Sequence, residues 1–126
     1  MSLLQRIFPA SGIVRFRNPA RDRATDAARF ATVRETLATT LAGIDAEIAG
    51  LTRRRKEALD RASCVIGTVD ACSYGREEAD EEALVEAETQ IRNANERLTA
   101  LHAQRLAFVD LDERLVAHIG GGGSVA

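Results

Sequence analysis

Two stretches of this chain place apolar residues at alternating steps of three and four positions. This spacing is typical of a helix that packs along a seam against another helix. Nine of the ten seam positions in the first stretch are apolar, as are nine of the eleven in the second. The pattern therefore predicts two long helices that pack together. The seam positions are Leu37, Leu41, Ile44, Ile48, Leu51, Arg55, Ala58, Ala62, Val65 and Val69, followed by Leu84, Ala87, Ile91, Ala94, Leu98, Leu101, Arg105, Phe108, Asp112, Leu115 and Ile119.

The composition favours an all-α fold. Only 4% of the residues are aromatic and there is no Trp, so a core has to be built from Leu, Ile, Val and Ala. Side chains of this kind suit the narrow seam between two helices better than a β-sheet, which favours β-branched and aromatic residues. The only prolines are Pro9 and Pro19, so no proline interrupts a helix after residue 20.

Local signals place the ends of the two helices. Asn18 is suited to cap a helix that has Pro19 at its first position, and Gly67 is suited to the left-handed conformation that ends a helix. Four glycines, Gly120–Gly123, make continuation of the second helix costly in backbone entropy. The expected organisation is a basic, extended N-terminal arm over 1–18, a helical hairpin over 19–119 (first helix 19–66, tip 67–75, second helix 76–119) and a flexible Gly-rich tail over 120–126.

The short connection predicts that the two helices are antiparallel neighbours in a long coiled coil. Their register stays open. If the turn is symmetric about the predicted tip, the numbers of two facing residues add to about 142, whereas a longer or lopsided tip gives about 152. The second register sets Arg105 opposite Glu47, and we expect an ion pair between them that fixes the register, as buried polar groups do in some coiled coils.

The second helix carries apolar residues beyond those of its seam. They widen the apolar stripe past what one partner helix covers, which indicates a surface that binds another protein or a second hairpin in a four-helix bundle. The alternative is that Phe30, Val33 or the N-terminal arm folds back over them. The additional apolar residues are Leu106, Val109, Leu111 and Val116.

The N-terminal arm is basic although the whole chain has a formal net charge of only −2. A basic segment of this kind can order on an acidic protein surface, nucleic acid or anionic lipid, and it can equally be an ordinary disordered terminus. The arm residues that we expect to make contacts are Arg6, Arg15, Phe16 and Arg17.

A second basic cluster, Arg53–Lys56, lies inside the first helix. Four successive residues spread around a helix at about 100° each, so they do not form one flat face. Glu57 and Asp60 offset their charge, which favours a solvated charge cluster over a nucleic-acid patch.

Residues that could carry chemistry are few and scattered. His102 and His118 are far apart in the sequence, with no carboxylate or Cys at ligand spacing, so we expect no metal site and no cofactor. Cys64 and Cys72 are expected to be reduced thiols rather than a disulfide framework. A narrow coiled coil also offers no deep substrate pocket, so we expect no catalysis.

These observations favour a non-catalytic structural or assembly protein, a coiled-coil interaction module in a larger complex such as a phage-like particle or a secretion apparatus. Its partners would be proteins, including further copies of the chain. The alternatives are a nucleic-acid-binding or regulatory coiled coil that uses the basic arm and, third, a membrane-surface protein. No run of about 20 apolar residues and no secretory signal is present, so the expected location is the cytoplasm or an assembled particle.

Overall fold

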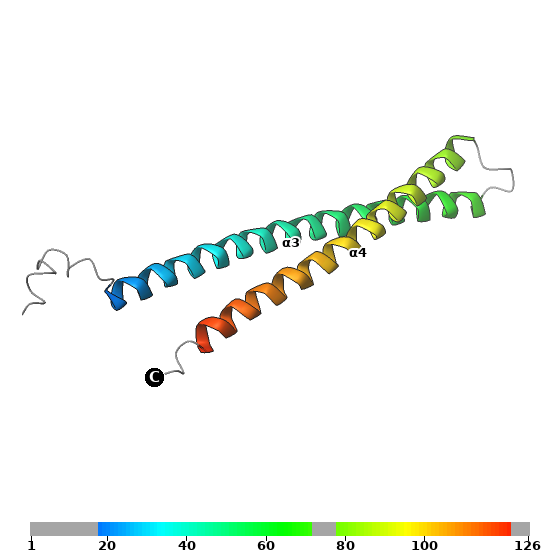
Figure 1. The fold of residues 1–126 in the computed structure, drawn as a ribbon. Helices are drawn as coiled ribbons and strands as arrows, with labels where there is room; N and C mark the ends of the chain where they lie inside the picture. Colours follow the sequence, from blue (N-terminus) through cyan, green and yellow to red (C-terminus); the bar gives the residue numbers. More distant parts are fainter. Residues whose placement is uncertain (1–17, 72–77, 122–126) are drawn as a thin grey trace, which may run out of the picture. The chain divides into compact units, whose positions relative to one another are not determined.

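The computed structural model describes residues 18–71 and 78–121, with side chains described for all of these except 68–71. These residues form two helices, α3 (Pro19–Ala71) and α4 (Glu78–Gly121), and no strand occurs among them. The helices pack against each other as an antiparallel hairpin (Figure 1). The predicted all-α helical hairpin is therefore confirmed. The expected extended arm and flexible tail fall on residues outside the described ranges, apart from Asn18 and the first two tail glycines.

The beginning of α3 follows from its capping residues. The side-chain oxygen of Asn18 accepts a hydrogen bond from the backbone N–H of Ala20 at 3.0 Å, and its carbonyl oxygen accepts one from the N–H of Asp22 at 3.0 Å. The side-chain bond satisfies an amide that has no partner within the helix, and the bond from Asp22 is the first i→i−4 bond of the helix. Pro19 lacks an N–H and has a fixed φ suited to the first helical position. The predicted start of this helix is confirmed.

The end of α3 differs from the prediction. The helix continues through Gly67 to Ala71, and no glycine in the described residues has a positive φ. One glycine inside a helix costs only about 1 kcal/mol relative to alanine, which is too little to end a long helix that is packed elsewhere. Gly67 is therefore not the terminating residue, and residues 67–71 of the predicted tip are helical. α4 begins at Glu78 and ends at Gly121, each two residues later than predicted.

The longer α3 also decides the register. With α3 ending at Ala71 and α4 beginning at Glu78, the turn is centred beyond the middle of the predicted tip. Side-chain hydrogen bonds between four pairs of described residues join the helices, and three of these pairs have residue numbers that add to 150 or 151, close to the second of the two registers. The pairs are Asp45–Arg105 (150), Arg55–Asn95 (150), Arg61–Gln90 (151) and Glu47–Arg97 (144).

The hydrophobic core lies along the predicted seam. Every buried side chain in the described residues occupies a seam position, and Leu101 is the largest that is fully buried. The other described seam positions are half-buried, apart from Ile119, which is exposed. The 3.5-residue spacing thus identified the packed face of both helices. The buried residues are Ile44, Ala58, Leu84, Ala87, Ala94, Leu98 and Leu101.

Residues 18–36 of α3 belong to a separate unit, and all the hairpin contacts described here are made by residues 37–121. Within the first unit, the hydroxyl groups of Thr25 and Thr32 donate to the carbonyl oxygens four residues earlier. Asp26 and Arg29 form an exposed ion pair at 3.3 Å. These are local contacts along one helix, and each contributes little to the free energy of unfolding.

Candidate interaction surfaces

Glu47 and Asp45 on α3 form ion pairs across the seam with Arg97 and Arg105 on α4, and neither is the predicted pair of Glu47 with Arg105. The guanidinium of Arg97 donates to both carboxylate oxygens of Glu47, at 2.8 and 3.3 Å. Arg105 donates instead to Asp45 at 2.8 Å. Asp45 and Glu47 are two residues apart, about 200° of rotation around the helix, so they lie on opposite sides of the seam. The predicted pair is wrong because Arg105 reaches the side of the seam that carries Asp45.

The Glu47–Arg97 pair is a local electrostatic feature of the hairpin surface. The hydrogen bond from Arg97 is the main reason that the pKa of Glu47 lies below its ordinary value of 4.5, and the positive charges of Arg97 and Arg54 lower it further. The same hydrogen bond raises the pKa of Arg97. Both side chains are 40% or more exposed, so the pair fixes geometry more than it stabilises the fold.

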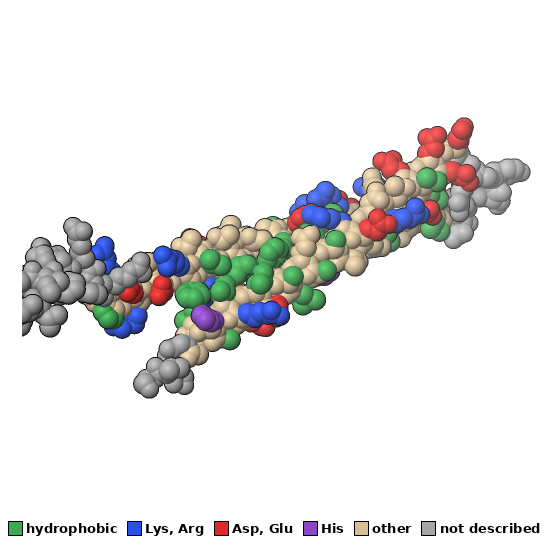
Figure 2. Space-filling model, in the orientation of Figure 1, with side chains coloured by type: hydrophobic (Ala, Val, Ile, Leu, Met, Phe, Trp, Pro, Cys, Tyr) green, Lys and Arg blue, Asp and Glu red, His purple; other side chains and the backbone are tan. Residues whose placement is uncertain are grey.

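Of the four apolar residues predicted as a partner-binding face, three are exposed. Leu106 is 70% exposed, Leu111 48% and Val116 46%, while Val109 is half-buried. Figure 2 shows apolar side chains gathered along α3 and α4 toward the end of α4. The excess apolar surface that the sequence indicated is therefore present on this hairpin.

These four residues do not share one face. Val116 follows Val109 by one seven-residue repeat, and Leu106 lies on the same side of the seam as Val109. Leu111 is two residues from Val109, about 200° around the helix, and so lies on the other side of the seam. We name Leu106, Val109 and Val116 the apolar flank. Leu111 belongs to the opposite side, which also carries Arg97.

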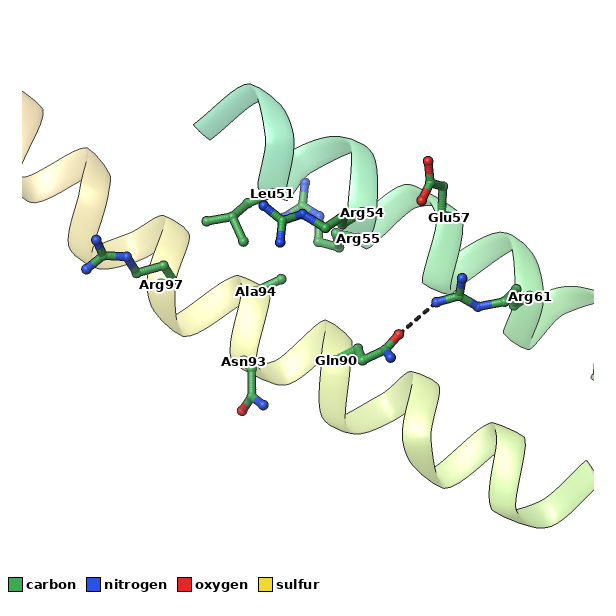
Figure 3. Close-up of a pocket in the computed structure, with 9 residues that line it drawn as sticks. All are labelled: Leu51, Arg54, Arg55, Glu57, Arg61, Gln90, Asn93, Ala94 and Arg97. Atoms are coloured by element: carbon green, nitrogen blue, oxygen red, sulfur yellow. Dashed lines mark hydrogen bonds between the residues drawn. The ribbon is translucent and has the colours of Figure 1, made fainter. Parts of the chain in front are cut away.

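A groove lined by arginines runs between the helices on the Arg97 side (Figure 3). It has a volume of about 570 Å³. The guanidinium of Arg61 donates to the side-chain oxygen of Gln90 at 2.7 Å, and that of Arg55 donates to Asn95 at 3.0 Å. Both partners are neutral amides, of which Gln90 lines the groove and Asn95 does not. The lining residues are Leu51, Arg54, Arg55, Glu57, Arg61, Gln90, Asn93, Ala94 and Arg97.

The structure divides the basic cluster Arg53–Lys56. Arg54 and Arg55 line the groove, whereas Arg53 lies within 4.0 Å of Glu57 in an exposed pair on α3. Lys56 is exposed and does not line the groove. The prediction of a solvated charge cluster therefore fits Arg53 and Lys56. It missed Arg54 and Arg55, which line the groove.

A second groove continues from the first toward the turn, and Arg61 and Gln90 line both. Its volume is about 580 Å³, and its ionisable lining includes the carboxylates of Asp60 and Glu86. Sequence reasoning missed both grooves. One signal was available, because Arg54 and Arg61, and likewise Gln90 and Arg97, are seven residues apart beside the seam. The lining residues are Asp60, Arg61, Cys64, Val65, Ala83, Glu86, Ala87 and Gln90.

The remaining predicted site residues give no further site in the described part of the chain. The arm residues Arg6, Arg15, Phe16 and Arg17 lie outside the described residues, as does Cys72. Cys64 is exposed on α3. Within residues 18–71 and 78–121, no group of three His, Cys, Asp or Glu side chains is placed to hold a metal ion. Neither described helix has a segment long and apolar enough to span a bilayer.

The chain matches no known protein-family model, no curated protein and no solved structure.

Proposed function

We propose that this chain is a non-catalytic structural or assembly protein, whose helical hairpin is a coiled-coil interaction module within a larger complex. The complex would lie in the cytoplasm or within an assembled particle, such as a phage-like particle or a secretion apparatus. The observation that carries the proposal is the exposure of the apolar flank, above all of Leu106, of which 70% is exposed.

The hydrophobic core of the hairpin is small, so burial of these exposed side chains would matter for its stability. Only seven side chains in the described residues are buried, and three of them are alanines, which remove little apolar surface from water. A leucine or valine side chain contributes about 1.5–3 kcal/mol when it becomes fully buried. Burial of Leu106 and Val116 against a partner would therefore add appreciably to what the hairpin gains on its own.

We propose a second copy of the chain as the partner on the apolar flank. Leu106, Val109 and Val116 are spaced by three and seven residues, so they form a stripe along one helix, which a similar stripe on another helix can cover. A two-fold contact between identical stripes would bring the hairpins together as a four-helix bundle.

Light scattering of the full chain over a concentration series, under reducing conditions, tests this proposal. We expect the wild-type mass to exceed that of one 13.6 kDa chain and to fall when Leu106 is replaced by Glu. Val85→Glu is the matched control, because Val85 is also on α4 and 62% exposed but lies near the other end of the helix. Circular dichroism would verify that both variants keep their helices.

Two results would contradict the proposal. The first is a wild-type chain that keeps the mass of one chain at all concentrations. The second is an association that Leu106→Glu and Val85→Glu weaken equally, since the apolar flank would then have no special role.

A further inference from the structure

The two grooves on the Arg97 side form one continuous surface whose halves carry opposite charge. Arg61 and Gln90 line both halves and are joined by a 2.7 Å hydrogen bond at their boundary. Apart from these shared residues, the half farther from the turn is lined by Arg54, Arg55 and Arg97 and by one carboxylate, Glu57, and Arg97 also pairs with Glu47 outside the lining. The half nearer the turn holds the carboxylate of Glu86, and Asp60 lies at the boundary, one residue before Arg61.

We propose that a second copy of this chain docks antiparallel on this groove, around a two-fold axis beside Arg61 and Gln90. A rotation about that axis exchanges the two halves, so the basic half of each copy meets the acidic half of the other. The inference rests on the proposed function, because it names a second contact between copies in the same assembly.

Charge complementarity favours a second copy over an extended polyanion. Arg55 and Arg61 donate to neutral amides. A carboxylate placed near these arginines would add a charge-assisted interaction, which is stronger than a hydrogen bond to an amide. Glu86 offers such a carboxylate on the turn side of Arg61 and Gln90. A polyanion that follows the groove would instead meet the carboxylates of Asp60 and Glu86 after passing the arginines, and the repulsion would oppose binding.

The apolar components of the groove also suit a helical partner. Leu51 and Ala94 line the basic half, and Val65, Ala83 and Ala87 line the acidic half. In Figure 3, Ala94 and Leu51 lie between the helices, while the carboxylate of Glu57 points away from that gap. A second hairpin would therefore find a shallow apolar floor with charged groups at its margins, as in many protein–protein interfaces.

The groove and the apolar flank lie on opposite sides of the seam, so one chain can use both contacts at once. Each contact is two-fold and by itself produces a dimer. Two different two-fold contacts on one chain link copies into a larger assembly. The groove contact is polar and screened by salt, whereas the apolar contact is much less sensitive to it.

The experiment isolates the groove in the Leu106→Glu chain, which lacks the apolar contact. We expect this chain to be a dimer at low salt and a single chain at high salt. Adding Arg54→Glu or Glu86→Arg should weaken the dimer about tenfold or more, since close charge pairs at interfaces contribute on that scale. The combined Arg54→Glu and Glu86→Arg exchange should restore dimerisation, because the swapped charges again match.

Arg53→Glu is the matched control for Arg54→Glu. The two arginines are neighbours in α3, but only Arg54 lines the groove. The described bond of the Arg54 side chain is a long one of 3.4 Å to the carbonyl oxygen of Gly50, so its replacement leaves the cross-helix bonds intact. The control should therefore keep the dimer, and equal weakening by both reversals would overturn the inference.

The outcomes separate this inference from the proposed function. If the wild type associates and Leu106→Glu is a single chain even at low salt, the apolar contact stands and the groove contact is wrong. If the Leu106→Glu chain keeps the wild-type mass, and adding Arg54→Glu to that chain dissociates the assembly, the groove contact stands and the apolar contact is wrong. If the Leu106→Glu chain is monomeric but binds a single-stranded oligonucleotide through Arg54, the groove is a nucleic-acid site and the inference is overturned.

Discussion

At the scale of single residues, two carboxylates two positions apart on α3 contact different arginines on α4. Glu47 binds Arg97 on one side of the seam, and Asp45 binds Arg105 on the other. The hairpin is thus held in register from both sides, although each pair is substantially exposed. Exposed pairs of this kind contribute modestly to stability, so their main effect is on the alignment of the two helices.

Replacement of Glu47 by Gln should lower the free energy of unfolding slightly at pH 7. The folded-state pKa of Glu47 lies below 4.5, so the ionised carboxylate favours the folded state above that pH, and this contribution is lost as the pH falls through the lowered pKa. The difference between wild type and Glu47→Gln should therefore shrink on acidification from about pH 4.5. Urea denaturation at pH 7 and pH 3 measures it.

Glu96→Gln is the control for this prediction, because it removes an exposed carboxylate next to Arg97 in the sequence without breaking the bond to Glu47. A difference between wild type and Glu47→Gln that stays constant from pH 7 to pH 3 would contradict the role assigned to the ion pair.

At the scale of the helices, Gly67 shows that a local signal for the end of a helix can be overridden by the packing of the rest of that helix. Glycine after the apolar pair Val65–Ile66 is a typical helix end, yet α3 continues to Ala71. The extension displaces the centre of the turn and with it the pairing of every residue along the hairpin. One residue in a helical rather than a left-handed conformation therefore changes which side chains meet across the whole seam.

Gly67→Ala should raise the free energy of unfolding by about 0.5–1 kcal/mol, because alanine loses less backbone entropy in a helix. A Cβ atom at Gly67 would meet nothing within 4 Å. Gly43→Ala, also inside α3 and equally open, should stabilise to a similar degree and serves as the reference. If Gly67 instead ended the helix with a positive φ, alanine at this position would lower the free energy of unfolding. Chemical denaturation therefore distinguishes the two cases by the sign of that change.

At the scale of the whole molecule, the hairpin has a narrow core and a large apolar and charged exterior. Its buried residues line one seam, and Leu106, Leu111 and Val116 stay exposed next to it. Acidic side chains gather over the first turns of α4, where the helix dipole favours them (Figure 2). The assembly that we propose would bury these exposed apolar residues in contacts with other chains.

The melting temperature should therefore rise with protein concentration. If folding and association are coupled, each tenfold increase in concentration adds about 1.4 kcal/mol per dimer to the free energy of unfolding. Thermal denaturation followed by circular dichroism over a hundredfold concentration range would measure this. Leu106→Glu should reduce the dependence, and a melting temperature independent of concentration in the wild type would argue against coupled assembly.

The sequence alone determined that the described residues form two helices, where α3 starts and which face each helix buries. These features depend on local periodicity and capping, and each described seam residue except Ile119 is at least half-buried as predicted. The excess of apolar residues on α4 was also visible in the sequence, since it depends only on which residues α4 contains.

Only the tertiary structure decided how the two seams are aligned. Both registers match apolar residues to apolar residues, so the hydrophobic pattern does not distinguish them. The choice depends on the length of the turn and on cross-helix pairs such as Asp45–Arg105, which join residues far apart in sequence. The division of the apolar residues between two sides and the charged groove around Arg61 follow from that alignment, because each needs both helices in place.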